Sequence, residues 1–175
     1  VEAGLDPFFQ TLGRADRLAI LLDCVDELPL RRHEIRGNPA GLLARLLNRI
    51  DALKAERVFA RELCDWASAA EKDAGDRATR EAAKREIEFA ELYATHDRLL
   101  SESGSLDSGD LILELGRLLH SREDVRERIA ERFTYVMADE YEDAGAARQG
   151  LLEALASHGN LLVACDPMQA IRRYR

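Results

Sequence analysis

Residues 134–143 read Thr-Tyr-Val-Met-Ala-Asp-Glu-Tyr-Glu-Asp, an apolar stretch that runs directly into two adjacent carboxylates, Asp139 and Glu140. Such a stretch predicts a short strand with both acids at its carboxyl end. The pattern returns at Leu161–Cys165, a second apolar stretch that is followed by Asp-Pro-Met-Gln. Because residues 149–157 between them predict a helix, the whole segment is expected to form a βαβ unit, whose parallel strands end at one common crevice.

The composition predicts a soluble, mainly helical protein. The chain has 175 residues, enough for one domain or two small ones, and 46% of them are hydrophobic. Frequent Leu and Ala with only four prolines favour helices. No apolar run is long enough for a membrane span, and the first residues lack signal-peptide features, so we expect a cytoplasmic protein without a membrane partner. The three cysteines are widely spaced, which argues against a disulfide framework and a zinc site.

Charge is unevenly distributed along the chain, although the formal net charge is −8. Residues 31–61 contain eight Arg or Lys against three acids, a net charge of +5. Residues 106–160 contain twelve acids against six arginines, a net charge of −6. A basic helical lobe beside an acidic lobe is compatible with a protein that holds a phosphate backbone in one place and a metal ion in another. A solvated helix face explains a basic run equally well.

Apolar periodicity predicts helices through the first hundred residues. Asn38 is expected to cap a helix that starts at Pro39, and a longer helix is expected over residues 80–101. The first of these helices has an apolar stripe: Leu42, Leu43, Leu46, Leu47, Ile50 and Leu53. Residues 101–105 read Ser-Glu-Ser-Gly-Ser, the most linker-like stretch of the chain. The sequence therefore predicts a helical subdomain over residues 1–104 and a second segment over residues 105–175.

The two strand motifs resemble those of the superfamily I DNA helicases of the UvrD/Rep family, a PcrA-like group. In that family, a strand ending in Asp-Glu-aromatic-Gln-Asp is followed by one ending in Gly-Asp-x-x-Gln-Ser-Ile-Tyr. Upstream, Leu106–Leu111 is similar to the family's Leu-Asp-Phe-x-Asp-Leu, and residues 36–40 and 50–54 are similar to its inserted helical (1B) subdomain. The resemblance implies a mainly α fold, in which residues 1–104 form the helical insertion. Residues 105–175 would form part of a RecA-like α/β domain of the P-loop NTPase type, with two parallel strands.

The resemblance also implies a function. The intact protein would be an ATP-dependent 3′–5′ DNA helicase or translocase in DNA repair or recombination, with Mg²⁺ and ATP as cofactors. Its partners would be single-stranded DNA, a duplex junction and the remaining helicase domains of the parent chain. The 175 residues contain no Gly-x-x-x-x-Gly-Lys-Thr/Ser loop, the phosphate-binding (Walker A) motif. We therefore expect this stretch alone to bind no cofactor and to be inactive.

The family motifs assign roles to six residues. Asp139 would hold Mg²⁺, Glu140 would orient and deprotonate the attacking water, and Gln169 would sense the terminal phosphate. Tyr174 stands where the family has an aromatic residue that stacks on a DNA base, and Arg175 where it has an arginine near the DNA backbone. Arg172 replaces a tyrosine that touches DNA.

Other departures from the family pattern leave alternatives open. Glu142 replaces a Gln, Arg148 replaces another Gln, and Cys165 stands where Gly is usual. One alternative is a non-catalytic helical module whose basic stripe binds DNA or an acidic protein. Another is a metal-dependent phosphoesterase with a two-metal cluster of four acids: Asp139, Glu140, Asp143 and Asp166.

Overall fold

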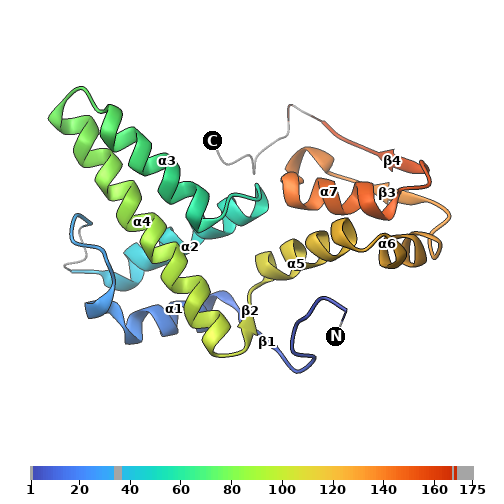
Figure 1. Cartoon of the computed structure of the whole chain (residues 1–175), viewed down its shortest axis with the longest axis horizontal. Helices are drawn as coiled ribbons and strands as arrows, with labels where there is room; N and C mark the ends of the chain where they lie inside the picture. Colours follow the sequence, from blue (N-terminus) through green and yellow to red (C-terminus); the bar gives the residue numbers. More distant parts are fainter. Residues whose placement is uncertain (1, 34–36, 167, 169–175) are drawn as a thin grey trace. The chain divides into compact units, whose positions relative to one another are not determined.

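A computed structural model describes residues 2–33, 37–166 and 168 of the chain (Figure 1). These residues form seven α-helices, two short 3₁₀-helices and two small parallel sheets, so the predicted mainly α fold is confirmed. They group into two compact units. The helical unit comprises the described residues of Phe9–Leu53 and Val58–Asp107. The C-terminal unit comprises the described residues of Val1–Phe8, Lys54–Arg57 and Ser108–Arg175.

The helical unit is built from α-helices with one very small sheet. Strands β1 and β2 pair in parallel, with Gln10 opposite Ser105 and Thr11 opposite Leu106. Helices α3 and α4 lie side by side, as Figure 1 shows. In chain order the elements are β1 (Gln10–Thr11), α1 (Arg14–Asp23), η1 (Val25–Glu27), α2 (Pro39–Ala55), α3 (Ala60–Asp73), α4 (Arg77–Glu102) and β2 (Ser105–Leu106).

Side-chain caps define where the two longest helices begin. The Oδ1 atom of Asn38 accepts a hydrogen bond from the backbone N–H of Gly41 at 2.8 Å, which confirms the predicted start of α2. Asp76 caps α4 in the same way, because its Oδ1 accepts from the backbone N–H of Thr79 at 2.8 Å. This hydrogen bond lowers the pKa of Asp76. The cap also explains why α4 begins at Arg77, three residues before the position that periodicity predicted.

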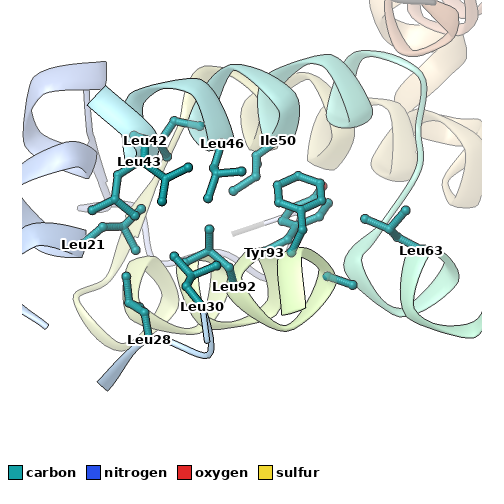
Figure 2. Close-up of a cluster of buried hydrophobic side chains, with 13 residues drawn as sticks. Leu21, Leu28, Leu30, Leu42, Leu43, Leu46, Ile50, Leu63, Leu92 and Tyr93 are labelled. Atoms are coloured by element: carbon teal, nitrogen blue, oxygen red, sulfur yellow. The ribbon is translucent and has the colours of Figure 1, made fainter. Parts of the chain in front are cut away.

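The predicted apolar stripe of α2 forms the centre of the helical unit's core. Figure 2 shows Leu42, Leu43, Leu46 and Ile50 of α2 among side chains from other elements of this unit. Those neighbours include Leu21 of α1, Leu63 of α3, and Leu92 and Tyr93 of α4. The Tyr93 ring is fully buried, and its hydroxyl donates to the carbonyl oxygen of Val58 at 3.3 Å. The core therefore depends on residues from four helices that are far apart in sequence.

Replacement of Leu43 by Ala tests this core. The Leu43 side chain is 0% exposed, so its truncation leaves a cavity, and we expect a loss of about 2–5 kcal/mol in the free energy of unfolding. Urea denaturation of the purified chain measures this loss. Arg45→Ala, an exposed position of the same helix, is the control and should change stability by less than about 0.5 kcal/mol. Equal effects of the two substitutions would contradict the assigned core.

A buried arginine, Arg17 of α1, pairs with two carboxylates from other parts of the helical unit. The guanidinium of Arg17 donates to Oδ1 of Asp51 and to Oδ2 of Asp107, both at 2.8 Å. Burial works against the charge of Arg17, but the two carboxylates outweigh it and raise its pKa. Asp107 is fully buried, and the preceding residues of β2 pair with β1. Ser105–Asp107 therefore group with the helical unit.

A second buried acid, Glu88 of α4, is surrounded by hydrogen-bond donors. Its carboxylate accepts from the backbone N–H of Arg32 at 2.8 Å and from the Arg32 guanidinium at 2.7 Å. The Nδ1 atom of His33 lies 3.3 Å away. Burial alone would raise the pKa of Glu88, but the interactions with Arg32 and His33 outweigh it, and the pKa lies below its ordinary value. Glu88 therefore favours the folded state only when it is ionised.

This shift predicts a pH-dependent effect of Glu88→Gln. Because the folded-state pKa is lowered, the stabilisation by Glu88 is present above the ordinary value of 4.5 and is lost as the pH falls through the folded-state value. The substitution should therefore destabilise the protein near neutral pH, and the difference from the original chain should shrink in acid. Urea denaturation over a pH series measures the two curves. Parallel curves at all pH values would show that Glu88 does not titrate as proposed.

The C-terminal unit packs three helices beside a pair of strands. Its elements are α5 (Ser108–Ser121), α6 (Glu123–Ala130), β3 (Val136–Ala138), η2 (Tyr141–Asp143), α7 (Ala146–Leu155) and β4 (Leu161–Val163). Strands β3 and β4 are parallel, with Val136 opposite Leu161 and Ala138 opposite Val163. The predicted βαβ connection is thus confirmed, although β4 ends at Val163 and not at Cys165. Helix α7 is the crossover between the two strands.

Both strands of this sheet carry exposed apolar side chains. Met137 and Leu162 are opposite one another in the parallel register and are 72% and 62% exposed. Parallel sheets are normally covered on both faces. The side chains of this sheet are apolar like those of a protein interior, but they are exposed.

None of the helices in the described ranges combines the length and the apolar character that a membrane crossing requires.

Candidate functional site

Asp139 and Glu140 follow the last residue of β3 and border a pocket in the C-terminal unit. The pocket has a volume of about 420 Å³, within the range of small-molecule sites. We call it the acidic pocket. Its lining combines apolar residues from α5 and α7 with polar residues around the end of β3: Ile112, Ala138, Asp139, Glu140, Tyr141, Asp143, Ala144, Arg148, Leu151 and Leu152. Part of the lining is therefore apolar, and we call Ile112, Leu151 and Leu152 the apolar wall; the rest of the lining includes three carboxylates and one guanidinium.

Backbone hydrogen bonds bring the carboxyl ends of β3 and β4 together. The N–H of Ala164 donates to the carbonyl of Ala138 at 2.8 Å, and the N–H of Tyr141 donates to the carbonyl of Ala164 at 3.1 Å. The turn that carries Asp139 and Glu140 is thus held against the residue that follows β4. This is the edge at which open parallel sheets place their ligands.

Glu140 has an unusual backbone conformation. Its φ and ψ angles are 51° and 42°, in the left-handed region that non-glycine residues rarely adopt. The preceding side chain stabilises the turn, because Oδ1 of Asp139 accepts from the backbone N–H of Glu140 at 2.9 Å. Strained conformations of this kind cluster at functional sites. The strained residue of this turn is therefore one of the acids that line the pocket.

The strain at Glu140 makes opposite predictions for two substitutions. Glu140→Gly should not reduce stability, because glycine adopts the left-handed region without steric cost. Glu140→Val should lower the free energy of unfolding by about 1–3 kcal/mol, because a β-branched side chain is strained in that region. Thermal or urea unfolding of both variants provides the comparison. A glycine variant that is less stable than the valine variant would contradict the assigned conformation.

The acidic pocket offers oxygen ligands that suit a small divalent cation. Mg²⁺ keeps several waters and is held by one or two carboxylates together with phosphate oxygens. Asp139 and Glu140 are both exposed at the pocket, so their carboxylates are accessible to such an ion. Within the described ranges, no group of three or more His, Cys, Asp or Glu side chains is arranged to hold a metal.

Nearly the whole chain matches a family model. The model of the UvrD/REP helicase N-terminal domain aligns with residues 3–175. The chain belongs to the UvrD/REP helicase N-terminal domain family. The predicted resemblance is thereby confirmed at the level of the family.

Relatives in the UvrD/REP family share about one third of the aligned residues. Over 87 residues the chain is 34% identical to the ATP-dependent DNA helicase PcrA of Bacillus subtilis, which covers 49% of the chain and 12% of that protein. Over 93 residues it is 33% identical to the ATP-dependent DNA helicase Rep of Escherichia coli, which covers 53% of the chain and 14% of that protein. PcrA of Leuconostoc citreum is 36% identical over 87 residues, 49% of this chain and 12% of its own length. The chain thus spans 12–14% of the length of these relatives.

The structure places some of the predicted UvrD/REP motif residues and not others. Asp139 and Glu140 lie together at the acidic pocket, and Asp143 lines it as well. Asp166 follows β4 and accepts a hydrogen bond from the backbone N–H of Met168 at 3.0 Å. Four predicted site residues lie outside the described residues: Gln169, Arg172, Tyr174 and Arg175.

The structure describes the surroundings of three residues that depart from the UvrD/REP motifs: Glu142, Arg148 and Cys165. One carboxylate oxygen of Glu142 is buried and has no hydrogen-bond partner among the described residues, an unfavourable state for an acceptor. Arg148 lines the acidic pocket, where its positive charge faces an acidic rim. Cys165 is exposed two residues after the end of β4.

Sequence reasoning did not identify the apolar wall of the pocket. Ile112 comes from α5, whereas Leu151 and Leu152 come from α7. All three belong to helical apolar stripes, and such stripes predict burial without distinguishing a core from a pocket wall. Arg148 lies in the first turn of α7, one residue before the helix that the sequence predicted over residues 149–157, so the sequence did not place it on the crossover helix.

Proposed function

We propose that this chain is part of an ATP-dependent DNA helicase and that the acidic pocket is part of its Mg²⁺-nucleotide site. The observation that carries this proposal is the pair Asp139–Glu140 at the pocket mouth, held at the meeting point of two parallel strand ends. The family assignment supports it, because the similar proteins PcrA and Rep bear the name ATP-dependent DNA helicase. An Asp-Glu pair in the sequence alone would not support this function, since such pairs occur at many turns; the position of the pair at the two strand ends is what supports it.

The two carboxylates have different tasks in this proposal. Asp139 holds Mg²⁺ directly or through a water, and the ion supplies charge neutralisation to the phosphates. Glu140 orients the attacking water and accepts its proton, since phosphoryl transfer depends on positioning and on charge stabilisation. The left-handed backbone at Glu140 supports this division, because the two consecutive acids have different backbone conformations. Arg148 at the same pocket is placed to approach a phosphate group.

The rest of the nucleotide site comes from elsewhere in the proposed enzyme. The chain has no Walker A motif, so the groups that hold the β- and γ-phosphates belong to other parts of the full-length protein. Gln169 is proposed to sense the terminal phosphate. The exposed face of β3 and β4 is the surface on which further elements of a RecA-like domain would pack. The isolated chain is accordingly proposed to be inactive.

The helical unit is proposed to be the insertion that holds DNA. Its sequence carries the basic run of residues 31–61 except residues 54–57, and phosphate contacts supply most of the affinity of a non-specific DNA binder. Arg172, Tyr174 and Arg175 are proposed to contact the single strand. Movement in the 3′–5′ direction, a role in repair or recombination and a cytoplasmic location rest on the family resemblance alone.

Substitution of Glu140 by Gln in the full-length protein tests the proposed function. We expect DNA-stimulated ATP hydrolysis to fall by about 10²- to 10⁴-fold, because the amide cannot accept the proton of the attacking water. ATP binding, measured with a fluorescent nucleotide, should persist. Asp139→Asn should shift the Mg²⁺ dependence of hydrolysis to higher concentration. The control is Glu153→Gln, an exposed acid on α7 that does not line the pocket, and it should retain full activity.

Two other outcomes would replace the proposal. Cleavage of DNA by the 175-residue chain with Mg²⁺, abolished by Asp139→Asn, would establish the phosphoesterase alternative. Salt-dependent DNA binding by a full-length protein that hydrolyses no ATP would establish the non-catalytic module.

A further inference from the structure

The outer face of α3, in the helical unit, carries an exposed tryptophan. Trp66 is the only tryptophan of the sequence, and it is 60% exposed. Phe59, the N-cap residue of α3, precedes it by two helical turns and is 46% exposed. The opposite face of α3 carries the buried Leu63 and Ala67, and the helix lies beside α4 (Figure 1). Because aromatic residues are enriched at protein interfaces, two exposed ones on a single helix indicate a binding surface.

The charges around Trp66 are mainly acidic. Residues 60–73 contain four acids against two basic residues, a net charge of −2, whereas residues 31–61 carry +5. Glu62 lies one turn before Trp66, and Asp65 and Asp73 are exposed on the same helix. Neither aspartate forms an ion pair with another residue of the described ranges. Such a surface repels the phosphates of a nucleic acid and attracts a partner with positive charge.

Helix α4 shows how an acid and an aromatic ring hold one arginine in this unit. The guanidinium carbon of Arg49 lies over the ring of Phe89, 4.0 Å from its centroid. Arg49 also pairs with Glu86, one turn before Phe89, at an Nη2–Oε2 distance of 2.7 Å. The arginine therefore makes a cation–π contact and an ion pair at the same time.

Glu62 and Trp66 repeat this arrangement on α3 without the arginine. Residues three or four positions apart on a helix are neighbours, so the acid and the ring of α3 have a spacing equivalent to those of α4. No arginine in the described part of the chain lies over the Trp66 ring. The position that Arg49 fills on α4 is thus available to a partner on α3.

The carboxylate of Glu62 is held in place before any partner arrives. Its Oε2 atom accepts the backbone N–H of Phe59 at 3.0 Å, the capping interaction at the start of α3. The other oxygen makes no hydrogen bond within the described ranges and can accept one from a guanidinium. A side chain that is already ordered loses less conformational entropy on binding, which favours association at this point.

We propose that the outer face of α3 binds a protein partner through an arginine-rich segment. One guanidinium stacks on the indole of Trp66 and pairs with Glu62, while Asp65 and Asp73 attract further arginines. Arginine suits this surface better than lysine, because its planar guanidinium stacks on a ring and binds a carboxylate at once. None of these residues lines the acidic pocket, so the surface serves a second binding event.

Peptide binding to the purified chain tests this surface. The probe is a short peptide of alternating arginine and glycine, and a matched peptide carries lysine in place of each arginine. Tryptophan fluorescence reports on the proposed contact directly, because Trp66 is the only tryptophan. We expect the arginine peptide to change the emission of Trp66 along a saturating curve. The lysine peptide should bind about threefold more weakly or worse.

Substitutions locate the contact, with fluorescence anisotropy of a labelled arginine peptide as the readout. Trp66→Ala should weaken binding about tenfold or more, as removal of a central aromatic residue does at protein interfaces. Glu62→Gln should weaken it about two- to fivefold, the size of an exposed ion pair, while the amide keeps the capping hydrogen bond. The matched control is Glu91→Gln, which removes the same charge from an exposed position of α4 and should leave binding unchanged. Circular dichroism verifies that each variant keeps its helical content.

Three kinds of result would overturn the inference. Failure of the arginine peptide to bind, or binding that persists in the folded Trp66→Ala variant, would remove the proposed surface. Equal binding of the two peptides, with equal losses in Glu62→Gln and Glu91→Gln, would show only a general attraction to an acidic chain. Binding of single-stranded DNA that Trp66→Ala abolishes, without binding of the arginine peptide, would assign this face to nucleic acid. The proposed function stands or falls separately, since none of these measurements involves ATP.

Discussion

The packing of α2 is the constraint on which the rest of the structure depends. Its apolar stripe supplies the central layer of the helical unit's core, and its last turn buries Lys54 in the C-terminal unit. The same helix contributes Asp51 to the charge network that buries Arg17 and Asp107. Apolar burial drives the assembly, whereas the buried charges select one register, since a displaced helix would leave ions unpaired in the interior.

The acidic pocket shows how a strained turn and an apolar wall combine to form a site. The hydrogen bonds of Tyr141 and Ala164 hold the carboxylate turn at the strand ends, and Glu140 takes a left-handed conformation within it. Side chains of α5 and α7 add an apolar surface to the pocket: Ile112, Leu151 and Leu152. Electrostatic interactions are stronger beside such a surface than in open water, which favours the binding of charged ligands there.

Local patterns predicted much of the fold because their physical basis is local. The capping of α2 by Asn38 depends on the next three residues, and the parallel pairing of β3 and β4 follows from a helix between two apolar stretches. The family and the Asp139–Glu140 motif were likewise readable from short segments. Arg17 and Asp107 are 90 residues apart in sequence, and no local pattern connects them. Lys54 was detectable only in part: it falls on the apolar stripe four residues after Ile50, a position at which a lysine must find a buried partner.

The sequence by itself determined the helical character of the chain, the start of α2, the βαβ connection and the family to which it belongs. These features arise from side-chain periodicity, capping and short motifs, all of which act over a few residues. The tertiary structure alone decided that Asp110 neutralises Lys54, that Gly145 must lack a side chain where it meets Ala55 and that Ile112 lines the same pocket as Glu140. Those relations depend on which distant segments meet, because burial and charge pairing act through space and not along the chain.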